Sequence, residues 1–110
     1  MSPSKTISIE TAEPAAPDLA GVDVVTLLQA LSDPVRLAMV RQLWGCDDGE
    51  LACGRIEVPV TKSTATHHLK ILCRAGLTAE RSEGTRKFIR LRRDELDRRF
   101  PGLLESVLRA

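Results

Sequence analysis

The chain has 110 residues, a length that suits a single small domain. Tyr is absent and only 3% of the residues are aromatic, so the core must consist of aliphatic side chains, which favours a mainly helical fold over a β-sandwich. No run of about 18 apolar residues is present, and this excludes a membrane-spanning helix. The first residues lack the apolar segment of a signal peptide, so we expect a cytoplasmic protein whose three cysteines are reduced thiols.

The net charge of +1 conceals a strong difference between the two halves of the chain. Residues 1–60 contain four Lys or Arg and nine Asp or Glu, a net charge of −5, whereas residues 61–110 contain twelve and six, a net charge of +6. Such polarity within one domain predicts that one side of the molecule faces a polyanion.

Residues 1–20 are rich in Pro, Ala, Ser, Thr and Glu, a composition typical of a flexible tail, so we expect the folded domain to comprise residues 21–110. A first helix should begin after Asp23, which is a good N-cap. Its apolar residues recur at helical spacing, at Val24, Leu27, Leu28 and Leu31.

A second helix is predicted to start at Pro34, with Asp33 as its cap, and to end at Gly45. It is apolar around most of its circumference, so we expect it to form the centre of the core. Residues 50–56 should form a short helix. Thr61 then caps a further helix that Gly76 terminates. A short helix followed by a longer, exposed one is typical of a helix-turn-helix.

The helix that follows Thr61 has two distinct faces at 100° per residue. Ala65, His68, Leu69, Leu72 and Cys73 share the inner face. Hydroxyl, imidazole and cationic side chains occupy the outer face and flank, and these can bond to base edges or phosphates in a major groove: Lys62, Ser63, Thr66, His67, Lys70 and Arg74. The two adjacent histidines therefore have different predicted roles, His67 in contacting DNA and His68 in packing.

Residues 77–91 read as two short strands around a turn at Glu83 and Gly84, with basic residues near the tip. A helix with short polar side chains beside a basic hairpin is a combination that suits DNA recognition.

Three segments, ALSDPVRLAMVRQL, STATHHLKILCRAGL and EGTRKFIRL, resemble the ArsR/SmtB family of bacterial winged-helix repressors in order and spacing over residues 23–91. The resemblance implies a homodimer with a winged helix-turn-helix fold that binds a palindromic operator in double-stranded DNA. It also implies that Lys62, Ser63, Thr66 and His67 read DNA, and that Arg81, Arg86 and Lys87 contact phosphates.

Many members of that family sense metals, but their ligand patterns are incomplete in this chain. One family site needs a Cys-x-Cys pair on the short helix, where only Cys53 is present. The other uses His and carboxylates on the C-terminal helix, and no His follows His68. We therefore expect neither a metal site nor a cofactor. Cys46 and Cys53 remain as a thiol pair that could respond to oxidants, persulfide or arsenite, or they are ordinary small residues.

The C-terminal segment carries a second apolar stripe after a break at residues 100–102. Together with the first helix it predicts a dimer interface made of Val24, Leu27, Leu28, Leu103, Leu104, Val107 and Leu108. The alternative is that the stripe packs against its own subunit.

The sequence thus predicts a homodimeric, sequence-specific transcription repressor. One alternative is a repressor of the same fold that senses thiol chemistry or arsenite through Cys46 and Cys53. Another is a winged helix that binds only proteins. We do not expect an enzyme, because the sequence contains no nucleophile–base pair and no phosphate-binding loop.

Overall fold

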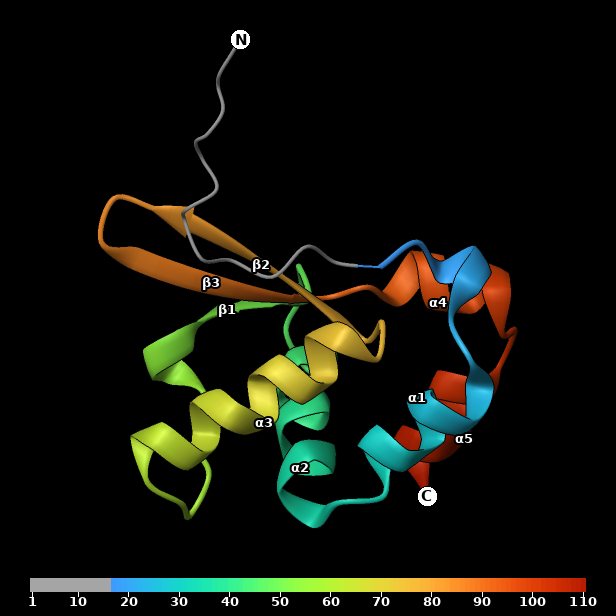
Figure 1. Ribbon diagram of the computed structural model, residues 1–110, viewed down its shortest axis with the longest axis horizontal. Coiled ribbons are helices and arrows are strands. Elements are labelled where there is room, and N and C mark those ends of the chain that lie inside the picture. The colour runs from blue at the N-terminus through green and yellow to red at the C-terminus, as the bar shows by residue number, and fades with distance from the viewer. Residues whose placement is uncertain (1–16) are drawn as a thin grey trace, which may run out of the picture.

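Residues 17–110, which the computed structural model describes, form helices packed around one end of a three-stranded antiparallel sheet (Figure 1). The α-helices are α1 (Val24–Leu31), α2 (Pro34–Trp44), α3 (Lys62–Arg74), α4 (Arg93–Arg99) and α5 (Leu103–Arg109). The strands are β1 (Glu50–Ala52), β2 (Thr78–Glu83) and β3 (Arg86–Leu91), and two short 3₁₀ turns are η2 (Leu19–Gly21) and η3 (Cys53–Arg55). This is the predicted mainly helical fold with a β-wing. None of the helices in the described range is both long enough and apolar enough to cross a bilayer.

The sheet has the order β1-β3-β2, and its two longer strands form the hairpin that we call the wing. Thr78 pairs with Leu91 at one end of the wing and Glu83 with Arg86 at the other. The tip of the wing projects away from α1, α4 and α5 (Figure 1).

The short helix predicted for residues 50–56 is wrong. Glu50–Ala52 instead forms β1, which pairs with β3 through Glu50 opposite Arg90 and Ala52 opposite Phe88. Only one 3₁₀ turn follows, at Cys53–Arg55, before the chain becomes extended. Pairing with β3 satisfies the backbone of this segment, and Gly54 weakens any longer helix.

The core is centred on α2, as the sequence predicts. Met39, Val40 and Leu43 are fully buried there, and they join Leu72 of α3 and Ile89 of β3 in one apolar cluster. Helix α3 and the wing are therefore anchored to the same core.

The predicted caps fix the starts of three helices. The carboxylate of Asp33 accepts hydrogen bonds from the backbone N–H groups of Val35 and Arg36 at 2.8 and 3.1 Å, and that of Asp23 accepts one from Val25. Thr61 caps α3 by accepting from the N–H of Thr64. These bonds satisfy donors that the first helical turn leaves free.

Gly76 ends α3 in a left-handed conformation, with φ at +94°. The N–H of Leu77 donates to the carbonyl of Leu72, and the N–H of Gly76 donates to that of Cys73, which together form a Schellman motif. A Cβ at Gly76 would lie only 2.8 Å from a methyl group of Val22, so both backbone and packing require glycine here.

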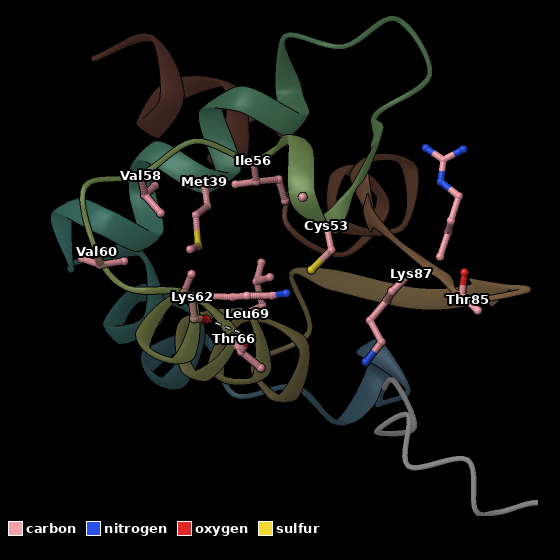
Figure 2. Close-up of a pocket in the computed structure, with 13 residues that line it drawn as sticks. Met39, Cys53, Ile56, Val58, Val60, Lys62, Thr66, Leu69, Thr85 and Lys87 are labelled. Carbon is pink, nitrogen blue, oxygen red and sulfur yellow. Dashed lines mark hydrogen bonds between the residues drawn. The ribbon is translucent and has the colours of Figure 1, made fainter.

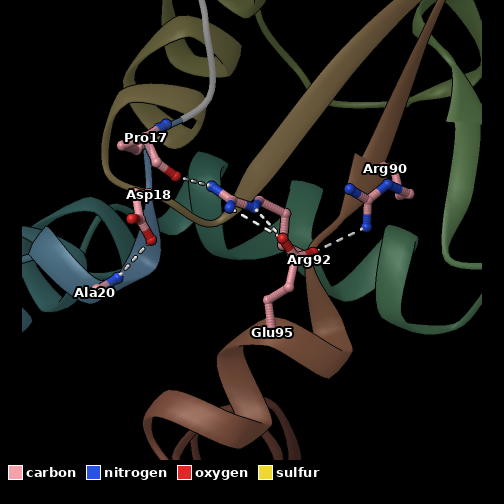
Figure 3. A network of polar contacts seen from close by, with 6 residues as sticks. All are labelled: Pro17, Asp18, Ala20, Arg90, Arg92 and Glu95. Carbon is pink, nitrogen blue, oxygen red and sulfur yellow. Dashed lines mark hydrogen bonds and ion pairs between the residues drawn. The ribbon is translucent and has the colours of Figure 1, made fainter.

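The segment before α1 is tied to the sheet and to α4 by a buried arginine (Figure 3). Arg92 donates to the carbonyl of Pro17 at 2.7 Å and pairs with Glu95 at 3.0 Å, while Arg90 reaches the other oxygen of Glu95. Leu19 is buried. Residues 17–20, which the sequence assigns to the flexible tail, therefore pack on the domain, and residues 1–16 lie outside the described range.

The C-terminal helix packs mainly against its own chain. Leu27 of α1 and Leu104 and Leu108 of α5 are 1%, 3% and 5% exposed, so they belong to the core of the single chain. Because the single chain already covers these three side chains, they offer little surface to the dimer interface that the sequence predicts. Val24 and Leu28 remain 39% and 43% exposed, as does their neighbour Val25 at 54%.

Candidate nucleic-acid interface

The outer face of α3 carries the polar side chains that the sequence assigns to DNA recognition. All of them are exposed: Lys62, Ser63, Thr66, His67, Lys70 and Arg74. Five of the six, all except Arg74, line one shallow depression on the surface. The opposite face is held in the core by Leu69, Leu72 and Cys73. A rigidly anchored helix with an exposed polar face can enter a major groove without rearranging its backbone.

The hydroxyl of Thr66 donates to the backbone carbonyl of Lys62 at 3.0 Å. A hydroxyl oxygen that donates its proton keeps two lone pairs, so the exposed Thr66 can still accept a hydrogen bond from a base amino group. The N-terminus of α3 beside it favours a negatively charged group, because the first N–H groups of the helix point outward.

His68 is held against Arg36 of α2, which agrees with the packing role predicted for it. Its Nδ1 lies 3.1 Å from Nη1 of Arg36, which in turn donates from Nε to the carbonyl of Ala30 at 2.8 Å. A guanidinium group has no acceptor, so Nδ1 of His68 is the acceptor and the ring proton resides on Nε2. His67 has no such bond and is exposed.

The wing lies across a cleft from the start of α3. Lys62 and Thr66 of α3 line the same cleft as Thr85, Arg86 and Lys87 of the wing (Figure 2). Gly84 provides the left-handed residue of the tight turn, with φ at +63°. A duplex lying against the outer face of α3 would therefore bring its backbone near the wing.

Arg81 is held by partners that the sequence did not reveal. Its guanidinium donates to both carboxylate oxygens of Glu50 at 2.8 and 2.9 Å and lies 4.3 Å from the ring centre of Phe88. The hydrogen bonds from Arg81 lower the pKa of the Glu50 carboxyl group. Arg81 must exchange this partner, or share it, before it can contact a phosphate.

Arg86 and Lys87 differ in how much of their charge is available. Arg86 lies 5.1 Å over the ring of Phe88 and is exposed, whereas Lys87 has a 3.5 Å contact with Glu80. The ring of Phe88 thus makes cation–π contacts with both Arg81 and Arg86. The sequence pattern did not point to Glu50 or Phe88, because their roles depend on the pairing of β1 and β2 with β3, and the wrongly predicted helix concealed the pairing of β1.

Cys46 and Cys53 lie in different surroundings and are not joined. Cys46 donates from Sγ to the carbonyl of Gln42 at 3.3 Å, at the end of α2, whereas Cys53 lines the cleft between α2, α3 and the wing. Both are free thiols. Burial, assisted by the nearby Glu80, raises the pKa of the Cys53 thiol, which opposes formation of a reactive thiolate.

Within residues 17–110, no group of three or more His, Cys, Asp or Glu side chains is placed to hold a metal ion. The three-dimensional arrangement thus adds no ligand set to those considered from the sequence.

Two curated relatives match a large part of the chain. One is the uncharacterized HTH-type transcriptional regulator YceK of Bacillus subtilis (strain 168), 40% identical over 83 residues that span 74% of this chain and 82% of the relative. The other is the HTH-type transcriptional regulator Rv2034 of Mycobacterium tuberculosis, 38% identical over 65 residues, or 57% of this chain and 58% of the relative. No family model matches the chain.

Two solved structures share the arrangement of helices and wing. The crystal structure of a possible transcriptional regulator for arsenical resistance has a TM-score of 0.58 at 26% identity, over 74% of this chain and 81% of that one. The transcriptional repressor BigR from Xylella fastidiosa has a TM-score of 0.56 at 29% identity, over 70% of this chain and 85% of its own.

The anchored polar helix and basic wing define the class of winged-helix DNA-binding proteins. Together with the relationship to YceK, they show that the chain belongs to the helix-turn-helix transcriptional regulators.

Proposed function

We propose that this regulator is a homodimeric repressor of the ArsR/SmtB kind that acts in the cytoplasm and binds a palindromic operator. The observation that carries this proposal is the exposed polar face of α3 beside the cations of the wing. In each subunit α3 enters the major groove, where Ser63, Thr66 and His67 contact base edges. Lys62, Lys70, Arg74, Arg86 and Lys87 neutralise phosphates.

An exposed apolar face supports the proposed dimer. Val24, Val25 and Leu28 of α1 are 39 to 54% exposed in the single chain, and the half-buried Leu103 and Val107 of α5 extend the apolar surface. A two-fold axis through this face would present two copies of α3 to successive turns of DNA, the geometry that a palindrome requires.

The contacts of the thiols favour an ordinary packing role over the alternative of a thiol- or arsenite-responsive repressor. Cys46 is bonded to the carbonyl of Gln42, and the raised pKa of Cys53 opposes loss of its proton. The remaining alternative, a winged helix that binds only proteins, makes an opposite prediction about DNA and is decided by the experiment below.

The test is selection of duplexes from a random pool by the purified protein, followed by affinity measurements over a range of salt concentrations. We expect an inverted repeat with half-site centres about 10 base pairs apart or a multiple of this. The affinity should fall steeply with salt, because phosphate contacts release counterions. No enriched sequence and a flat salt dependence would contradict the proposal and favour the protein-binding alternative.

A further inference from the structure

A cleft of about 570 Å³ lies between α2, η3, the start of α3 and the wing (Figure 2). This is within the range of about 300–1,000 Å³ that small-molecule sites occupy. Figure 2 shows the sulfur atoms of Met39 and Cys53 on the side of α2 and η3, facing Leu69 and Thr66 of α3. The cleft is therefore a feature of the space between four elements and not of one helix.

The inner wall of this cleft is apolar and only partly covered. Met39 and Leu69 form its floor, and Ile56, Val58 and Val60 line it while remaining half-buried. The extended connection before α3 is braced by Gln42, which holds the backbone of Glu57 through two hydrogen bonds of 2.6 and 2.8 Å. Apolar surface left open in a concave, braced site favours an apolar ligand.

The rim of the cleft is cationic. Lys62, Arg86 and Lys87 line it, and none of its lining residues is acidic. Lys62 makes no ion pair with any residue of the described part of the chain, and Lys87 contacts Glu80 at 3.5 Å. Arg86 stacks on Phe88, on the face of the wing opposite to the buried Ile89. An anionic group at the rim would therefore meet Lys62 from α3 and Lys87 from the wing.

We propose that this cleft binds an amphiphilic monoanion, with its apolar body against Ile56, Val58 and Val60 and its carboxylate at Lys62 and Lys87. Aliphatic and aromatic carboxylates share this chemistry. Because Lys62, Thr66 and Lys87 also belong to the proposed DNA interface, the ligand and DNA compete, and the ligand releases the repressor. This last step rests on the proposed function, whereas the binding of the ligand does not.

The competition has a thermodynamic consequence. If the ligand lowers DNA affinity by some factor, DNA must lower ligand affinity by the same factor. The carboxylate removes positive charge that would otherwise face phosphates, so the salt dependence of DNA binding should also become shallower in the presence of the ligand.

The first experiment observes the cleft directly and without DNA. The chain contains two methionines, Met1 and Met39, so NMR of protein labelled with ¹³C in the methionine methyl groups has one reporter on the floor of the cleft, assigned with Met39→Leu. Titration with decanoate and, separately, with 2-naphthoate should shift the Met39 signal. The probe that binds more tightly shows whether the cleft prefers an aliphatic or an aromatic group. Decan-1-ol should bind about tenfold more weakly, and decyltrimethylammonium more weakly still.

Two variants test the location. A Cβ at Gly54, which lines the cleft, would meet nothing within 4 Å, so Gly54→Leu should fill the cleft, keep the fold and abolish the carboxylate-induced shift. Gly21→Leu is the matched control, because Gly21 is equally open but lies outside the cleft. Lys62→Gln with Lys87→Gln should remove the preference for decanoate over decan-1-ol while Met39 still responds to both.

An unmoved Met39 signal at saturating probe concentrations, an equal response to the cationic amphiphile, or an unchanged response in Gly54→Leu would each overturn the proposal.

Competition is then measured on the selected duplex with the wild-type protein and Gly21→Leu, where decanoate or 2-naphthoate should lower affinity. A Met39 response in a protein that binds no DNA would contradict the proposed function and leave the ligand site standing. DNA binding without any Met39 response would contradict the ligand site and leave the proposed function standing.

Discussion

At the residue scale, two adjacent histidines show how helix phase separates recognition from packing. His68 accepts a hydrogen bond from Arg36 and so helps to hold α3 against α2. His67, one position earlier, is exposed on the face that carries Ser63 and Lys70. One hundred degrees of rotation thus gives the same side chain two different environments.

We predict that His67→Ala lowers operator affinity by about 1–3 kcal/mol, the usual cost of removing a hydrogen bond to a base, with little effect on binding to random duplex. His68→Ala should instead lower the melting temperature, because it removes the hydrogen bond that joins α3 to Arg36 of α2. Binding to both duplexes and thermal melting of both variants provide the measurement. If His68→Ala loses specificity while His67→Ala has no effect, the recognition face is assigned incorrectly.

A second prediction concerns the ion pair at the base of the wing. Glu50→Gln removes the negative charge that holds Arg81, so we expect a few-fold tighter binding to both operator and random duplex, with a steeper salt dependence. Glu105→Gln is the matched control, because it also removes a carboxylate paired with an arginine, Arg109 on α5. Weaker binding by Glu50→Gln alone would mean that the pair positions the wing and that Arg81 does not contact phosphate.

At the scale of elements, the functional unit is α3 and the wing mounted on one core. Leu69 and Leu72 anchor the helix, and Ile89 anchors the wing beside it. β1 adds a third strand to the wing and brings Glu50 to Arg81. The wing is therefore braced at its base, while its tip at Gly84 and Thr85 remains exposed.

For the wing, we predict that Arg86→Ala with Lys87→Ala weakens binding to operator and to random duplex nearly equally, because phosphate contacts carry no sequence information. The slope of log affinity against log salt should become shallower by about one unit for each phosphate that the variant no longer neutralises.

The control for this pair is Arg98→Ala with Arg99→Ala, which removes two exposed cations from α4, remote from the tip of the wing (Figure 1). An equal loss of affinity in this control would show that overall charge, rather than the position of the wing, determines the effect.

At the scale of the whole molecule, one chain leaves an apolar face on α1 uncovered while α5 is used to complete the core. Leu27, Leu104 and Leu108 are buried within the chain, whereas Val25 and Leu28 are exposed. The proposed dimer therefore depends on Val25 and Leu28 and not on the buried leucines.

We predict that Val25→Glu with Leu28→Glu produces a folded monomer, because charged groups would have to be buried in the dimer but stay in water in the monomer. Sedimentation velocity should show the change in mass, and operator affinity should fall by at least about a hundredfold as the two half-sites are uncoupled.

Leu104→Ala serves as the contrast. It should cost about 2–5 kcal/mol of folding free energy through the cavity it leaves, without a specific effect on assembly. A wild-type protein that sediments as a monomer at high concentration would contradict the proposed dimer.

The sequence by itself determined the features that depend on local chemistry. Asp23, Asp33 and Thr61 cap helices, Gly76 ends α3, and the 3.6-residue period separates the faces of α3, because each effect acts within one or two turns of the chain.

Only the tertiary structure decided the features that need distant partners. Residues 50–52 became a strand because β3 lay available to pair with them, and this pairing brought Glu50 to Arg81. Leu104 and Leu108 entered the core because α5 folds back on its own subunit. An apolar stripe specifies that it must be covered, but its period is the same whether its own chain or a second copy covers it, so packing alone makes the choice.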